Sequence, residues 1–150
     1  MQTDLRKRKV TMNFKDIICT LAGALGGAAA FLFGGWSSDL ITLLAFIGVD
    51  FISGVILAAV FKKSSKTENG ALSSKESFRG LCRKIEILLF VVIGNMLDLY
   101  LGTHFIRTAV IVGFMANELI SIVENAALMG ITSPAVENAI ELLKKGGKDV

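Results

Sequence analysis

Long apolar runs alternate with short polar segments along this chain, and the length of the runs determines the predicted fold. The runs cover residues 17–33, 40–61, 85–101 and 105–131. A helix needs roughly 17 to 25 mostly apolar residues to cross the hydrocarbon core of a bilayer. The pattern therefore predicts an all-α integral membrane protein with about four transmembrane helices.

A shorter amphipathic segment follows the fourth run. Ser133 and Pro134 are typical of the start of a helix. The apolar residues beyond them recur at helical spacing, at Val136, Ala139, Ile140 and Leu143. We therefore expect a short amphipathic helix in the C-terminal segment, at the membrane surface or against the bundle.

The fourth apolar run carries polar residues that lipid would not tolerate on an exposed face. These are Asn117, Glu118, Ser121, Glu124 and Asn125. At about 100° per residue they fall within an arc of roughly 120° on one side of a helix, and the opposite side is apolar. A charged side chain facing lipid costs at least a few kcal/mol. We therefore expect the rest of the chain to supply partners for this face.

Polar residues also occur inside the second and third runs. Asp50 lies about ten residues into its run, near the bilayer midplane at a rise of about 1.5 Å per residue. It is either protonated or turned toward partners or water. If the third run is antiparallel to the second, Asn95 reaches the depth of Asp50, and a hydrogen bond between them is expected. Asp98 likewise comes level with Arg107, which predicts an ion pair near the outer interface.

Small residues mark positions where helices could approach closely. Gly23 and Gly27 form a small-xxx-small pair in the first run, and Gly54 lies one turn after Asp50. Such residues favour helix association in membranes, where lipid provides no hydrophobic drive to pack. The pattern predicts helix packing but not its partner, which could be another helix of the same monomer.

The composition agrees with a membrane protein, and the basic residues indicate its orientation. Hydrophobic residues make up 53% of the chain and the mean hydropathy is +0.62, too apolar for a soluble domain of this size. Lys and Arg concentrate in residues 1–16, 62–84 and 132–150. The positive-inside rule places these three segments in the cytoplasm. We therefore expect a basic cytoplasmic N-terminus at 1–16, a transmembrane domain at 17–131 with a cytoplasmic loop at 62–84, and a cytoplasmic helix and tail at 132–150.

No residue pattern indicates catalysis, a cofactor or nucleic-acid binding. His104 is the only histidine, and Cys19 and Cys82 are too far apart for metal-ligand spacing. The chain has no phosphate-binding glycine loop after a strand and no basic patch interleaved with aromatic residues. Glu118 and Glu124 are six residues apart, which does not suit an acid-base pair on one helix. We expect no enzyme activity, no cofactor, no metal and no nucleic-acid partner.

Several motifs in order resemble the toxin-secretion/phage-lysis holins. They are Trp36, the Asp-Phe-Ile-Ser-Gly run at 50–54, Ser73-Ser74-Lys75 with Gly80 and Lys84, then Asp98, Arg107 and the polar run at 117–125. The resemblance covers about residues 36–143. Because the first run is less diagnostic and holins differ in span number, a three-span topology is the alternative.

The resemblance implies a non-enzymatic protein of the bacterial cytoplasmic membrane, and the positive-inside rule places both of its termini in the cytoplasm. Such a protein self-associates into lesions, through which an endolysin or toxin escapes without being bound specifically. The polar residues of the apolar runs are then the expected oligomerisation or lesion-lining contacts. These are Asp50, Asn95, Asn117, Glu118, Ser121, Glu124 and Asn125.

Three questions stay open in the sequence. Some holins have two start sites that differ in charge and timing, so Met12 is either a second start or an ordinary methionine. The basic start and first run resemble a signal peptide, but Gly34-Gly35-Trp36 is a poor cleavage site, and we expect an uncleaved helix. The alternative functions are a small proton- or cation-coupled transporter using Asp50 or Glu118, and an assembly subunit of a larger membrane complex.

Overall fold

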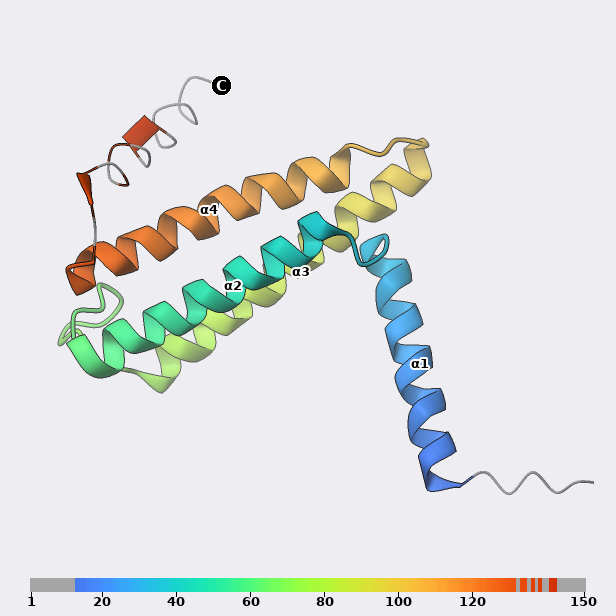
Figure 1. Ribbon diagram of the computed structural model, residues 1–150, viewed down its shortest axis with the longest axis horizontal. Helices are drawn as coiled ribbons and strands as arrows, with labels where there is room; N and C mark the ends of the chain where they lie inside the picture. The colour runs from blue at the N-terminus through green and yellow to red at the C-terminus, as the bar shows by residue number, and fades with distance from the viewer. Residues whose placement is uncertain (1–12, 132, 135, 137, 139–140, 143–150) are drawn as a thin grey trace, which may run out of the picture.

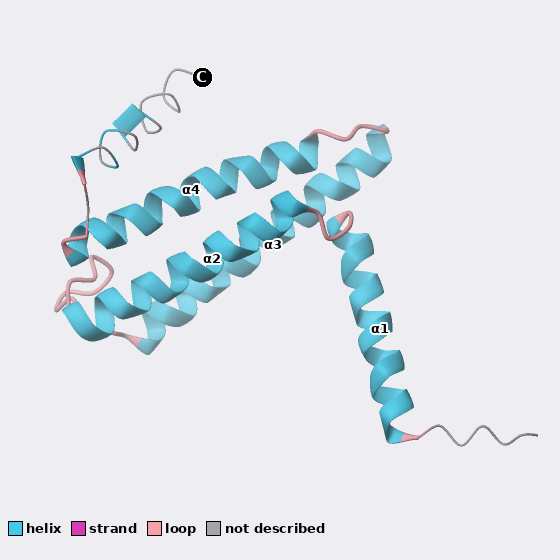
Figure 2. Cartoon of the chain, viewed as in Figure 1, coloured by secondary structure: helices cyan, strands magenta, loops and turns pink. Residues whose placement is uncertain are grey.

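The protein is described by a computed structural model covering residues 13–131, 133, 134, 136, 138, 141 and 142. Its elements are α1 (Phe14–Phe33), α2 (Ser38–Ile56) with a π-helical extension η1 (Leu57–Phe61), α3 (Ser74–Leu101) and α4 (Ile106–Met129). Within these residues every regular element is a helix (Figure 2). The all-α prediction is confirmed.

Helices α2, α3 and α4 form a three-helix bundle, and α1 diverges from one end of it (Figure 1). Helices α2 and α4 run in the same direction with α3 antiparallel to both. The buried apolar core consists of Leu40, Leu43, Ile87, Val91 and Ile111. We call the end with Ser38, Leu101 and Ile106 the turn end, and the end with Phe61, Ser74 and Met129 the loop end.

Helix α1 contacts the bundle only where it meets the turn end. Its packing is with α3, and none of its residues is buried. It ends at Gly34, whose φ of 70° is left-handed and which caps the last turn with its backbone N–H. A Cβ at Gly34 would lie 2.3 Å from Oδ1 of Asn95, so both the backbone angle and the space favour glycine.

Helix α3 begins earlier than the sequence pattern predicts. The third apolar run starts at residue 85, but the helix starts at Ser74 and runs for 28 residues. The connection between η1 and α3 is therefore confined to residues 62–73, and Lys84 lies on a helix. Residues 74–84 resemble a loop in composition. The helix nevertheless starts there, and Ser73 occupies its N-cap position in an extended conformation.

Three helical segments are long and apolar enough to cross a membrane: α1, Ser38–Phe61 and α4. Helix α3 is the fourth long helix, and its apolar part is interrupted by Glu86, Asn95 and Asp98. The chain is therefore a multi-pass membrane protein. Three of the four long helices therefore meet these limits of length and composition, and α3, antiparallel to α2 and α4, completes the bundle as a more polar member.

The predicted C-terminal helix is described only in part. Pro134, Val136, Asn138, Glu141 and Leu142 are helical, and the N–H of Val136 donates to the carbonyl of Ser133 over 3.0 Å. This agrees with a helix start at Ser133 and Pro134. Ala139, Ile140 and Leu143 of the apolar stripe lie outside the described residues, as do Met12 and the basic segment around it.

Candidate functional site

A lysine and two carboxylates meet inside the three-helix bundle. Nζ of Lys84 on α3 donates to Oδ2 of Asp50 on α2 over 2.6 Å and to Oε2 of Glu118 on α4. The side chains of Asp50, Lys84 and Glu118 are 8%, 14% and 1% exposed. All three helices of the bundle are therefore joined through one ammonium group. We call these three residues the charge cluster.

An amide extends the charge cluster toward the loop end. Nδ2 of Asn125 on α4 donates to Oδ1 of Asp50 over 3.2 Å and to Oγ of Ser53 over 3.0 Å. Gly54 lies beside it, because a Cβ there would be 3.7 Å from the same amide nitrogen. Both carboxylate oxygens of Asp50 are thus occupied. A Cβ at Gly54 would therefore make an ordinary van der Waals contact with Asn125.

The charge cluster makes intramembrane charges tolerable but leaves them dependent on one another. Removing one partner of a buried ion pair typically costs about 3–5 kcal/mol, because the remaining charge is buried without compensation. Here Lys84 is shared by two carboxylates, so its loss would leave both Asp50 and Glu118 without their salt-bridge partner. The lysine is the most consequential member of the cluster.

Sequence reasoning missed the role of Lys84. It placed this residue at the end of a cytoplasmic loop, where a lysine is an ordinary topology determinant. The available signal was the pair of carboxylates in predicted spans, since buried carboxylates require a cation or hydrogen-bond donors. Lys84 is the basic residue closest in sequence to the start of the third run.

A cavity at the loop end reaches the charge cluster. It has a volume of about 70 Å³ and is lined by α2, α3, Asn125 and residues of the 62–73 connection. Asp50 and Lys84 are part of its lining, together with Glu76 and Ser77. This space is large enough for a few water molecules. The arrangement can hydrate the cluster from the loop end.

The polar face of α4 is divided between the bundle and its surface. Glu118 is buried and Asn125 and Ser121 are partly buried, whereas Asn117 and Glu124 are exposed. This order follows the helix: at about 100° per residue, Asn117 and Glu124 lie at one edge of the arc and Glu118 and Asn125 at the other. The expectation that other helices supply partners for this face is confirmed for Glu118 and Asn125.

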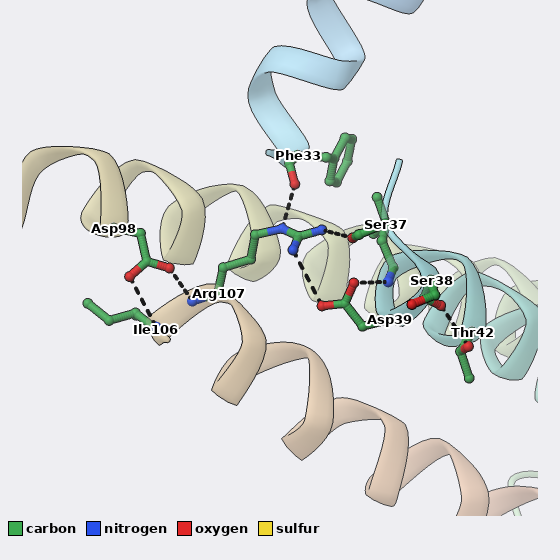
Figure 3. A network of polar contacts seen from close by, with 9 residues as sticks. Phe33, Ser37, Ser38, Asp39, Thr42, Asp98, Ile106 and Arg107 are labelled. Atoms are coloured by element: carbon green, nitrogen blue, oxygen red, sulfur yellow. Dashed lines mark hydrogen bonds and ion pairs between the residues drawn. The ribbon is translucent and has the colours of Figure 1, made fainter. Parts of the chain in front are cut away.

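A second polar network joins the helices at the turn end around Arg107 (Figure 3), beside a cavity of about 250 Å³. The guanidinium donates to the carbonyl of Phe33 through Nε over 2.6 Å, to Oγ of Ser37 over 2.6 Å and to Oδ2 of Asp39 over 3.4 Å. It therefore binds the last turn of α1 and the first turn of α2 to the start of α4. A cation beside the carbonyl end of α1 also complements its helix dipole.

The expected ion pair between Asp98 and Arg107 is replaced by a different contact. Asp98 accepts hydrogen bonds from the backbone N–H groups of Ile106 and Arg107, over 3.1 and 2.9 Å, and from Oγ1 of Thr103 over 2.5 Å. A carboxylate commonly caps the exposed N–H groups at a helix start. Asp98 thus caps α4, and the salt bridge of Arg107 is with Asp39.

The expected hydrogen bond between Asn95 and Asp50 is also absent. Nδ2 of Asn95 donates to the carbonyls of Phe31 and Leu32, over 3.1 and 2.9 Å, at the end of α1. Asp50 pairs instead with Lys84, and Asn95 lies 11 residues further along α3, about 16 Å nearer the turn end at 1.5 Å per residue. Asn95 and Arg107 together satisfy the last carbonyls of α1.

The glycines differ in what surrounds them. Nothing in the described part of the chain lies within 4 Å of a Cβ added at Gly23 or Gly27, so no intramolecular packing is observed there. Gly94 was not singled out from the sequence, yet a Cβ there would lie 3.1 Å from Cα of Arg107. The close helix approach is therefore between α3 and α4, at the turn end.

Metal-binding geometry is not found among residues 13–131 or the few described residues beyond them. No group of three His, Cys, Asp or Glu side chains there is arranged to hold a metal ion. Cys19 and Cys82 are both exposed free thiols. The polar arrangements of the bundle are ion pairs and helix caps.

Comparison with known proteins finds one matching family pattern and several similar sequences. The sequence pattern of the bacteriophage holin family matches residues 27–145. A probable holin of Bacillus phage phi105 is 36% identical, over 72% of this chain and 71% of its own. An uncharacterized protein of Listeria monocytogenes is 42% identical over 85% of this chain and 89% of its own. An uncharacterized 14.9 kDa protein of Clostridium perfringens is 38% identical over 74% of this chain and 80% of its own. No solved structure matches the chain.

Proposed function

Because the chain belongs to the bacteriophage holin family, we propose that it self-associates in the bacterial cytoplasmic membrane and forms lesions that release an endolysin or toxin. The observation that carries this proposal is the set of polar side chains on membrane-spanning helices, centred on the charge cluster. Such groups are costly in lipid and become favourable when they line water or contact another copy. The exposed positions Asn117 and Glu124 extend the same face of α4.

The proposed orientation has both termini and the 62–73 connection in the cytoplasm. Support comes from the lysines and arginines, which gather in residues 1–16, in residues 62–84 and after residue 143. The loop end of the bundle is then cytoplasmic, and the turn end with Arg107 faces outward.

The proposed partners are other copies of the chain and membrane lipid. The released endolysin or toxin passes through the lesion without a dedicated binding site. Helix α1 supports a role in association, because its residues are not buried and Gly23 and Gly27 leave one face open for a neighbouring helix. We propose no enzyme activity, in keeping with the family.

A proton- or cation-coupled transporter is the second candidate, favoured by one observation. The charge cluster holds two carboxylates and one ammonium beside a cavity at the loop end. Compact carriers use such groups to bind an ion near the midplane. The two candidates differ in scale, because a transporter moves one class of solute and leaves cells viable, whereas a holin passes proteins.

The test is expression of the full chain in bacteria that contain a protein-sized cytoplasmic reporter. Reporter release and entry of a small dye are followed together over time. Abrupt release of both after a delay supports the holin proposal. Continued growth without either signal, with the protein confirmed in the membrane fraction, contradicts it and favours the transporter.

A further inference from the structure

One lysine side chain connects the three helices of the bundle electrostatically. Lys84 is 34 residues from Asp50 and 34 residues from Glu118, and its ammonium contacts both carboxylates. In the described part of the chain, each carboxylate has Lys84 as its salt-bridge partner. Separating either α2 or α4 from α3 would therefore leave a carboxylate without its cation.

The contacts place Lys84 where it controls separation of the helices. Asp50 accepts two further hydrogen bonds, at Oδ1 from Nδ2 of Asn125 on α4 and at its backbone carbonyl from Oγ of Ser53 on its own helix. The same Asn125 nitrogen also donates to Oγ of Ser53. The side chain of Glu118 is 1% exposed, and its carboxylate accepts a hydrogen bond from Nζ of Lys84. Movement of α4 away from α3 at this level would break the Lys84–Glu118 pair.

The cavity at the loop end gives water a route to the ammonium group of Lys84. It is lined by Asp50 and Lys84 and bordered by the 62–73 connection. Water entering there can replace the protein contacts of the ammonium group, which lowers the cost of separating the charges. A second cavity, of about 250 Å³, lies at the turn end and is lined by Asn95, Asp98 and Arg107, so the apolar core separates it from the charge cluster.

We propose that Lys84 is a positioning residue that holds the bundle in its closed state, and that its two ion pairs must exchange for water or intermolecular contacts before a lesion forms. This inference rests on the proposed function and adds a residue that determines when the lesion forms. The polar groups that line the lesion are then the same ones that the closed bundle pairs internally. The stability of the ion pairs determines how long the closed state persists.

The first test is Lys84→Met, with Arg83→Met as its matched control. Arg83 is the preceding residue on α3, carries the same charge and is exposed. At equal membrane levels, Lys84→Met should release the protein-sized reporter earlier than the unsubstituted chain by at least twofold in time, and Arg83→Met should not. Unchanged or later release by Lys84→Met would overturn the proposal.

A triple variant separates the ion pairs from the basic residue itself. Lys84→Met combined with Asp50→Asn and Glu118→Met removes all three charges at similar volume, and a buried ion cluster replaced in this way is often neutral or more stable. Release by the triple variant should return to the normal delay or later. If the triple variant is as early as Lys84→Met alone, the loss of a cytoplasmic charge and not of the ion pairs determines timing, and the proposal is wrong.

A readout that does not depend on lysis keeps the two proposals distinguishable. The thermal unfolding midpoint of the full chain, purified in detergent, should fall in Lys84→Met and recover in the triple variant. If no variant releases reporter but the midpoints follow this order, the holin proposal fails while the ion-pair role of Lys84 stands. If the midpoints of all variants are equal, the closing role of Lys84 is refuted even where reporter is released.

Discussion

At the scale of single residues, the structure pairs polar groups whose partners the sequence left open. Asp50 and Glu118 were expected to need partners, and both receive the ammonium of Lys84. Asn95 was expected to contact Asp50, but it donates to the backbone at the end of α1. The guanidinium of Arg107 was expected to pair with Asp98, but it donates to Phe33, Ser37 and Asp39. A sequence indicates that a buried charge needs compensation; which side chain provides it depends on helix register and rotation.

A substitution at Glu118 tests whether the paired face of α4 affects lysis. Glu118→Leu should still insert into the membrane, because it makes α4 more apolar. It removes one of the two ion pairs of Lys84, so we expect an earlier onset of lysis. The measurement is the onset of turbidity loss at equal membrane levels, determined by immunoblot. Identical timing would exclude a role for Glu118 in triggering.

The arginine network predicts a large effect on stability from one side chain. Arg107→Met removes the hydrogen bonds that the guanidinium donates to Phe33, Ser37 and Asp39. Hydrogen bonds to charged groups contribute about 1.5–3 kcal/mol each to stability. We expect the free energy of unfolding to fall by about 2–4 kcal/mol in total, since contributions are not additive.

Arg79→Met is the control for Arg107→Met. Arg79 forms an ion pair with Glu76 over 2.8 Å on the surface of α3, and its side chain is 54% exposed. Exposed pairs contribute about 0–1 kcal/mol. Thermal unfolding of both variants in the same detergent gives the comparison. A loss of equal size in the two would contradict the assigned role of the turn-end network.

At the scale of elements, the sequence predicts helices well but their polar ends poorly. The predicted runs at 40–61 and 105–131 agree closely with α2–η1 and α4 because apolar length is a direct requirement of the membrane. The start of α3 was missed by 11 residues, since residues 74–84 are rich in polar residues and precede the apolar run by which the helix was located.

The contact between α3 and α4 is tested by two alanine substitutions of opposite expected sign. A Cβ at Gly94 would meet the backbone of Arg107 at 3.1 Å, so Gly94→Ala must push the two helices apart. A Cβ added at Gly113 on α4 would have nothing within 4 Å. Replacing a glycine by alanine inside a helix stabilises the folded protein by about 0.5–1 kcal/mol. Gly94→Ala should lower the unfolding midpoint and Gly113→Ala should raise it. Two increases would contradict the close approach at Gly94.

At the scale of the whole molecule, a compact bundle carries one divergent apolar helix (Figure 1). Three bundle helices satisfy their internal charges among themselves, whereas α1 is fixed by its last turn and is otherwise unburied. The family match begins at residue 27 and so includes the bundle and only the end of α1. The family pattern therefore covers the whole bundle, and α1 is the helix whose partner the proposed self-association must supply.

The proposed orientation of the chain predicts which thiols a membrane-impermeant maleimide reaches. Cys82 is exposed near the loop end and should react only after the membrane is opened. A cysteine introduced by His104→Cys, exposed at the turn end, should react in intact spheroplasts when Cys19 and Cys82 are changed to Ser. Labelling of Cys82 in intact spheroplasts, with the cysteine at position 104 labelled only after the membrane is opened, would show that the orientation is inverted.

The most direct test of the central claim is the time course of protein release from bacteria that express the full chain. A cytoplasmic enzyme reporter is measured in the medium while growth and dye entry are recorded in the same culture. The account predicts normal growth, then abrupt and simultaneous release and dye entry, with Lys84→Met shortening the delay. Sustained growth with the reporter retained, although the chain is present in the membrane, would contradict it.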